Sequence, residues 1–141
     1  MAQTGYFGRK TIMFIYSIIM GVLLISLGIS LRLEHPGMIP LPFMLGFVFS
    51  FQASTGPITW LYMAEIMQEK GLSIGTVLNW LFTLLFTVAL PTVKNVAGIS
   101  GVGILFMVVG ILTLGCAVFV ALVMKETKGK SLAERKNLYV K

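Results

Sequence analysis

The strongest constraint on the fold is a set of four long stretches that contain no Asp, Glu, Lys or Arg. They are residues 11–31, 35–64, 71–93 and 95–124, with 21, 30, 23 and 30 residues. Each is long enough to cross the hydrocarbon core of a bilayer as a helix, which needs roughly 20 apolar residues. Charged residues are only 11% of the chain, against about 25% in soluble domains. The chain is therefore expected to be a membrane protein that crosses the bilayer several times.

We expect an all-α membrane protein with four transmembrane helices at about 11–31, 39–67, 72–90 and 102–124. Helices are expected because lipid offers no partners to backbone N–H and C=O groups, and four segments of this length are too few for a closed barrel. Short connections at 32–38, 68–71 and 91–101 would join them, two of them rich in turn-forming Gly and Pro. The membrane bundle would occupy residues 1–124 and a basic tail residues 125–141.

The positive charges predict the orientation in the membrane. Four crossings place both termini on one side, where nine cations collect: Arg9, Lys10, Lys70, Lys125, Lys128, Lys130, Arg135, Lys136 and Lys141. Only Arg32 and Lys94 lie on the other side. The positive-inside rule then predicts that both termini are cytoplasmic. The basic tail is either a solvated segment attracted to anionic lipid or a segment with a specific structural role.

Composition and spacing exclude several classes of function. The net charge of +6 lies at the edges of apolar blocks rather than on a polar face, so nucleic acid is not an expected partner. One Cys and one His support neither a disulfide framework nor a metal cluster. The first apolar block is too long for the core of a cleavable signal peptide. No acid, base or metal set lies within the blocks, so neither an enzyme nor a cofactor is expected.

Neutral polar side chains recur at helical spacing inside two of the blocks. Thr76, Asn79, Trp80, Thr83 and Thr87 follow steps of three or four, and so do Gln52, Thr55 and Thr59. Gly56-Pro57, between Thr55 and Thr59, should kink the predicted helix at 39–67, because Pro57 has no backbone N–H. Amides and hydroxyls exchange hydrogen bonds with sugar hydroxyls, and indole rings pack on the apolar face of a sugar ring. This pattern suits a neutral polyol.

Structural explanations compete with this interpretation. The threonines could serve only as contacts between helices. Trp60 lies close enough to the end of its helix to belong to an interfacial aromatic belt, whereas Trp80 lies deeper. Gln52, near the middle of the membrane, needs either a partner helix or a wet cavity. Small residues spaced by seven, Gly103, Gly110 and Ala117, are expected to let a neighbouring helix approach closely.

Four motifs, in order, make the sequence resemble the last third of a sugar porter of the major facilitator superfamily, the group that includes facilitative glucose transporters. Gly8-Arg9-Lys10 resembles the G-R-R/K turn before the ninth helix. Gly56-Pro57-Ile58-Thr59-Trp60 followed by Ala64-Glu65 resembles the G-P-x-x-W and A/S-E motifs of the tenth. Asn79-Trp80 resembles the N-W pair of the eleventh, and residues 126–132 resemble the E-T-K-G motif after the twelfth. The resemblance implies helices 9–12 of a twelve-helix fold.

The resemblance also implies roles for individual residues. Gln52, Trp60, Asn79 and Trp80 match positions that contact hexose in the central cavity. Arg9, Glu65 and Glu126 match a cytoplasmic cluster of ion pairs that closes the inner gate, in motifs that include Gly8, Lys10, Lys70, Lys128 and Gly129. Three departures affect this gate: Gly5 stands where the family usually has Asp, Lys125 where it has Pro, and Lys70-Gly71 where it has R-G.

Two hypotheses of different classes follow. The first is that the chain is a fragment or truncated form of a hexose transporter that works by alternating access, and that it is not transport-competent alone because the other helices that hold the sugar are absent. The second is a small four-helix membrane protein that associates with other membrane helices and transports nothing. The expected partners are a hexose or similar polyol, the lipid bilayer, and either the N-terminal helices of the transporter or another membrane protein. The plasma membrane is the expected location.

Overall fold

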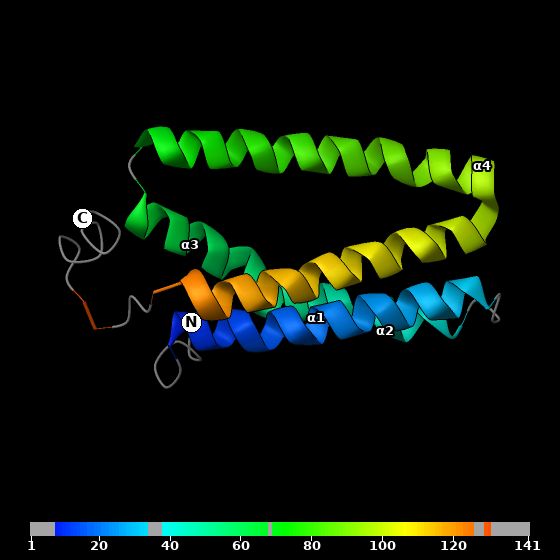
Figure 1. Cartoon of the computed structure of the whole chain (residues 1–141), viewed down its shortest axis with the longest axis horizontal. Helices are drawn as coiled ribbons and strands as arrows, with labels where there is room; N and C mark the ends of the chain where they lie inside the picture. Colours follow the sequence, from blue (N-terminus) through cyan, green and yellow to red (C-terminus); the bar gives the residue numbers. More distant parts are fainter. Residues whose placement is uncertain (1–7, 34–37, 68, 126–128, 131–141) are drawn as a thin grey trace.

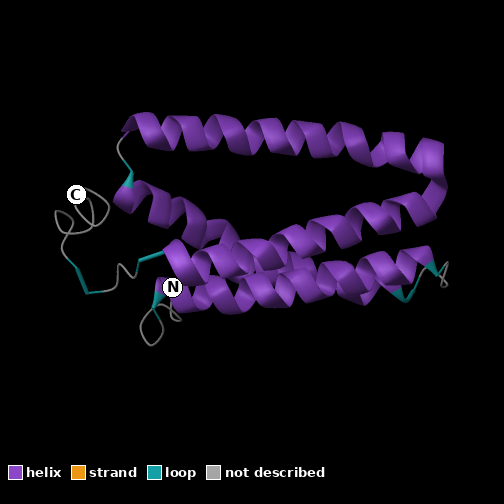
Figure 2. Ribbon diagram, in the orientation of Figure 1, coloured by secondary structure: helices purple, strands orange, loops and turns teal. Residues whose placement is uncertain are grey.

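The computed structural model of the chain describes residues 8–33, 38–67, 69–125 and 129–130. Within these ranges Figure 2 shows helices joined by short loops, and no strand. The elements in chain order are α1 (Arg9–Arg32), α2 (Pro40–Ser50), the π-helix η2 (Phe51–Thr55), α3 (Gly56–Ile66) and α4 (Glu69–Val123). The start of α1 and the ends of α3 and α4 lie at one end of the molecule (Figure 1). The all-helical class predicted from the sequence is confirmed for these residues.

Two of the described helices, α1 and α4, are long and apolar enough to cross a membrane by length and composition. The 24 residues of α1 begin after Gly8, whose carbonyl accepts the first helical hydrogen bond, from the Ile12 N–H at 3.1 Å. α4 has 55 residues, more than twice the roughly 20 that one crossing requires. α4 thus covers both of the helices that the sequence predicts at 72–90 and 102–124, and its helical geometry is interrupted at Gly98.

The predicted helix at 39–67 consists of three consecutive segments. α2 begins with Pro40. Proline lacks an N–H, but N–H groups in the first turn of a helix have no intrahelical partner, so no hydrogen bond is lost there. η2 follows without a break, and the Gly56 N–H donates to the Phe51 carbonyl, five residues back. Pro57 has no N–H to donate to the α-helical ladder. The π-helix η2 ends at Thr55, two residues before it. α3 then diverges from α1 toward the start of α4 (Figure 1).

The expected connection at 91–101 is corrected by the structure, because α4 is helical there except at one residue. Gly98 has φ 66° and ψ −165°, a combination that is essentially restricted to glycine. The chain reverses direction at this point, so that the second half of α4 runs back beside α1 (Figure 1). Pro91 lies inside the helix, where it removes one hydrogen bond without ending the helix; such breaks are tolerated in membrane-type helices.

α1 packs against the second half of α4 through glycines. A Cβ added to Gly28 would lie 2.5 Å from the Gly103 carbonyl oxygen, and one added to Gly110 would lie 3.0 Å from the Gly21 carbonyl oxygen. Gly103, Gly110 and Ala117 are all buried. The structure thus confirms the close helix approach that their spacing by seven predicts.

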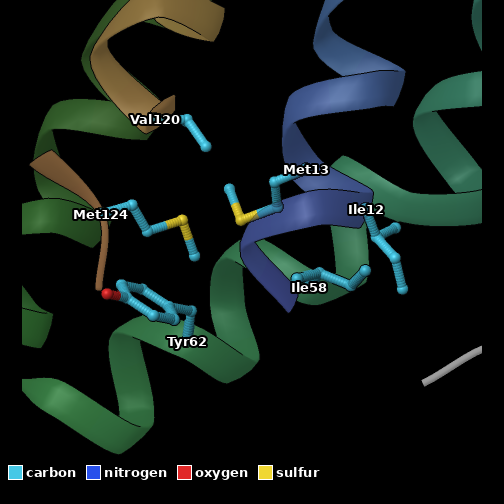
Figure 3. Close-up of a cluster of buried hydrophobic side chains, with 6 residues drawn as sticks. All are labelled: Ile12, Met13, Ile58, Tyr62, Val120 and Met124. Atoms are coloured by element: carbon cyan, nitrogen blue, oxygen red, sulfur yellow. The ribbon is translucent and has the colours of Figure 1, made fainter. Parts of the chain in front are cut away.

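The main cluster of buried side chains lies between the start of α1, the first two turns of α3 and the end of α4 (Figure 3). α1 contributes Ile12 and Met13, α3 contributes Ile58 and Tyr62, and α4 contributes Val120, with Met124 directly after its end. The first half of α4 is different, because its large apolar side chains are mostly exposed. Val77, Trp80 and Phe82 are 66%, 66% and 67% exposed. Exposed apolar surface of this kind is stable in lipid or against further helices, and not in water.

Candidate functional site

A cavity of about 250 Å³ lies between α3, η2 and the first half of α4. Seven residues line it: Phe51, Gly56, Thr59, Trp60, Met63, Gly75 and Asn79. None of these side chains is ionisable, whereas a hydroxyl, an indole N–H and a primary amide are present. Such groups donate and accept hydrogen bonds without charge. The cavity is suited to a neutral ligand with hydroxyl groups.

Local sequence places these groups opposite one another. Thr59, Trp60 and Met63 lie within little more than one turn of α3, while Gly75 and Asn79 are one turn apart on α4. A Cβ on Gly75 would collide with the Met63 Cε, so the absence of a side chain there makes room for Met63 between the two helices. Phe51 is held by stacking on Phe47, with ring centroids 6.3 Å apart.

The structure brings together two of the four residues that the sequence assigns to substrate. Trp60 and Asn79 line the same cavity, from different helices. Trp80 is 66% exposed and is not among the lining residues, because a neighbouring position on a helix points about 100° away. Gln52 is exposed on η2, beside the lining residue Phe51.

Sequence reasoning missed three of the lining residues, Phe51, Met63 and Gly75. Two of them could have been found from their spacing to a polar residue that the sequence analysis named. Met63 lies four residues after Thr59, and Gly75 four residues before Asn79, so both share a helix face with a polar group. Their apolar side chains, or the lack of one, give no separate indication of a site.

The threonines of the first half of α4 use their hydroxyl groups within their own helix. Thr76, Thr83 and Thr87 donate to carbonyl oxygens four residues back, at 2.9, 2.9 and 2.8 Å. Thr83 thereby bonds to the carbonyl of Asn79, one of the cavity residues. In the described part of the chain these hydroxyl protons are not used between helices, so the expectation that they join helices finds no support there.

An ion pair lies at the end of the molecule that holds the buried cluster. A guanidinium nitrogen of Arg9, the first residue of α1, contacts Glu65 Oε2 near the end of α3. The two side chains are only 18% and 10% exposed, so solvent screens their attraction weakly. The pair connects α1 to α3, and the structure thus brings together two of the three residues assigned to the charged cluster.

The remaining members of the predicted motifs are placed as follows. Gly8 precedes α1, Lys10 lies in its first turn, and Lys70 is exposed in the first turn of α4. Gly129 has a φ of 77°, which favours glycine. Glu126 and Lys128 lie outside the described residues. Among the residues that the structure describes, no group of three or more His, Cys, Asp or Glu side chains could hold a metal ion.

Comparison with known proteins gives a family match over almost the whole chain. The family model described as "Sugar (and other) transporter" matches residues 4–139. The chain is 33% identical to the arabinose-proton symporter of Bacillus subtilis, over 95% of this chain and 29% of that protein. It is 31% identical to the D-xylose-proton symporter of Escherichia coli, over 94% and 28%. It is 33% identical to the facilitated trehalose transporter Tret1 of Bombyx mori, over 90% and 27%.

A solved structure gives the same result for the fold. A crystal structure of a double tryptophan mutant of XylE matches with a TM-score of 0.89 and 28% identity. The match covers 98% of this chain and 30% of that one. The chain therefore spans less than a third of the length of the relatives that it matches.

Proposed function

The chain belongs to the "Sugar (and other) transporter" family, and on that premise we propose that it supplies helices 9–12 of a sugar transporter that works by alternating access. In this proposal the four helices are α1, the continuous segment α2–η2–α3, and the two halves of α4 on either side of Gly98. They cross the membrane with both termini in the cytoplasm, most simply at the plasma membrane. The separation of cations supports this orientation, because α1 and α4 begin, with Arg9 and Lys70, at the end of the molecule opposite to the one where α1 finishes with Arg32 (Figure 1).

The cavity carries the proposed sugar site. Trp60 and Asn79 lie in a single neutral cavity between two helices, and this is the observation on which the proposal rests. The Asn79 amide would exchange hydrogen bonds with sugar hydroxyls, and the Trp60 indole would cover an apolar face of the ring. Gln52 and Trp80 are sequence neighbours of the lining residues Phe51 and Asn79, and in the proposed transporter they would meet the sugar from adjacent positions. The substrate is a hexose or similar polyol, and the relatives named for arabinose, xylose and trehalose support a sugar.

Transport itself requires more than this segment. Substrate sites in such folds lie between the two halves of the protein, and the chain corresponds to less than a third of its relatives. The remaining helices would cover the exposed apolar side chains of the first half of α4. In this arrangement the Arg9–Glu65 pair would belong to the cytoplasmic gate, which must open once in each cycle.

A second candidate is supported by the same exposed surface. A membrane protein that only binds other helices would also expose Val77, Trp80 and Phe82. The two candidates differ in ligand binding. D-glucose added to the purified chain in detergent should quench Trp fluorescence if the cavity binds sugar, and the Asn79→Ala variant should not respond. No response in the unmodified chain, together with a membrane protein other than the remaining transporter helices that co-purifies with it, would support the second candidate.

A further inference from the structure

α3 has two faces with different surroundings. Ile58, Tyr62 and Glu65 follow one another at steps of four and three, and their exposed fractions are 7%, 8% and 8%. They face α1 and the end of α4, as the buried cluster and the ion pair show (Figure 3). Thr59, Trp60 and Met63 line the cavity. Because both faces belong to one helix, the contacts of the buried face fix the position of the residues that line the cavity.

Tyr62 makes the polar contact at the centre of the buried face. Its hydroxyl donates to the backbone carbonyl oxygen of Lys125 at 2.9 Å. Lys125 lies two residues beyond the last residue of α4, in the region where a helix leaves carbonyl groups without intrahelical partners. The ring lies beside Met124 and its oxygen points toward the chain that leaves α4 (Figure 3). A buried phenol needs such a partner, and this one connects α3 to α4.

The opposite end of α3 adjoins an interruption of the backbone ladder. The helix follows the π-helix η2 and begins with Gly56 and Pro57, where the backbone ladder is interrupted. Tyr62 and Glu65 fix the end beyond this interruption, through a hydrogen bond and an ion pair. Displacement of α3 about Gly56-Pro57 would have to break one or both of these contacts, and it would move Trp60 in the cavity.

From this arrangement we infer that Tyr62 is a positioning residue: its hydrogen bond to the Lys125 carbonyl sets the place of Trp60 in the cavity on the other face of α3. The inference rests on the proposed function for its effect on sugar binding, and on geometry alone for its effect on Trp60. Loss of the hydroxyl leaves the ring, the buried cluster and the Arg9–Glu65 pair in place. α3 then stays folded but is held by one hydrogen bond fewer.

The first experiment isolates Trp60. The chain has two tryptophans, so a Trp80→Phe background leaves Trp60 as the only emitting indole. Acrylamide quenching is then compared between this background, Tyr62→Phe and Tyr16→Phe. Tyr16, on α1, packs against the same cluster and serves as the matched control. Tyr62→Phe should change the quenching constant and Tyr16→Phe should not, with circular dichroism reporting equal helix content. An unchanged constant in Tyr62→Phe would overturn the inference.

The second experiment measures the consequence for sugar. In the intact transporter of which the segment forms part, Tyr62→Phe should raise the KM for D-glucose about fivefold, the change that corresponds to loss of one hydrogen bond. The maximal rate per molecule at the cell surface should stay within about twofold. A purely structural role for Tyr62 would instead lower surface expression. An unchanged KM would contradict the inference. If quenching of Trp60 changes while no sugar binds to any variant, the positioning role stands and the proposed function fails.

Discussion

Gly28 of α1 and Gly103 of α4 lie backbone against backbone. A Cβ on Gly28 would be 2.5 Å from the Gly103 carbonyl oxygen, and a Cβ on Gly103 would be 2.6 Å from the Gly28 carbonyl oxygen. Neither obstacle is the end of a flexible side chain, so neither can move aside without shifting a helix. Because lipid provides little hydrophobic driving force between helices, close contact of this kind is a main source of their association.

Replacement of Gly28 by alanine should therefore separate the two helices. We expect Gly28→Ala to lower the free energy of unfolding in mixed micelles by about 1–3 kcal/mol, the usual effect of overpacking. Gly115→Ala on α4 is the matched control, because nothing lies within 4 Å of a Cβ at Gly115. Titration with a denaturing detergent measures both variants. Equal stability of the two would contradict the close packing.

The reversal of α4 depends on the backbone of Gly98 and not on its neighbours. Nothing lies within 4 Å of a Cβ at this position, but its φ of 66° and ψ of −165° are nearly inaccessible to other residues. Both Gly98→Ala and Gly98→Asn should lower the free energy of unfolding by about 1–3 kcal/mol. Asparagine should give no relief, because it favours the left-handed helical region, where ψ is about +47°. A stable Gly98→Asn variant would show that the chain turns in another way.

The general architecture could be predicted because it depends on properties that are local in sequence. The absence of charge over 20 or more residues indicates a membrane-type helix without knowledge of its neighbours. The spacing of Gly103, Gly110 and Ala117 likewise specifies a face, and the structure buries it. The extent of α4 could not be predicted in this way. The sequence predicts a connection at 91–101, and the turn does lie within that range, but only Gly98 departs from helical geometry.

The candidate site could be predicted only in part, because a cavity is a relation between helices. Helical spacing grouped Asn79 with Trp80, although only Asn79 lines the cavity with Trp60. The contact between Tyr62 and Lys125 has no signal in the sequence, since it joins distant positions through a side chain and a backbone carbonyl. The π-helix η2 was also not evident, because its extra residue per turn arises from how the ladder passes Pro57.

The ion pair between Arg9 and Glu65 should make a measurable contribution to stability. Its side chains are mostly buried, and removal of one partner from such a pair costs about 3–5 kcal/mol. We expect Glu65→Gln to destabilise the chain in this range. The single exchanges Arg9→Glu and Glu65→Arg should each destabilise it as well, and the double exchange should destabilise it less than the sum of the two. Glu69→Gln, at the exposed start of α4, makes the same change in net charge and serves as the control. Full additivity of the two exchanges would contradict a direct interaction.

The proposed sugar contact is tested by the amide of Asn79. In the sugar transporter proposed above, Asn79→Ala should lower the apparent affinity for D-glucose about tenfold, because a sugar hydroxyl would lose its partner inside the cavity. Thr92→Val is the matched control: Thr92 lies on the same helix, bonds to its own Val88 carbonyl at 2.7 Å and does not line the cavity. Uptake of labelled glucose at equal surface expression measures both. Unaltered kinetics in Asn79→Ala would remove this residue from the proposed site, and with it the reason for placing sugar between α3 and α4.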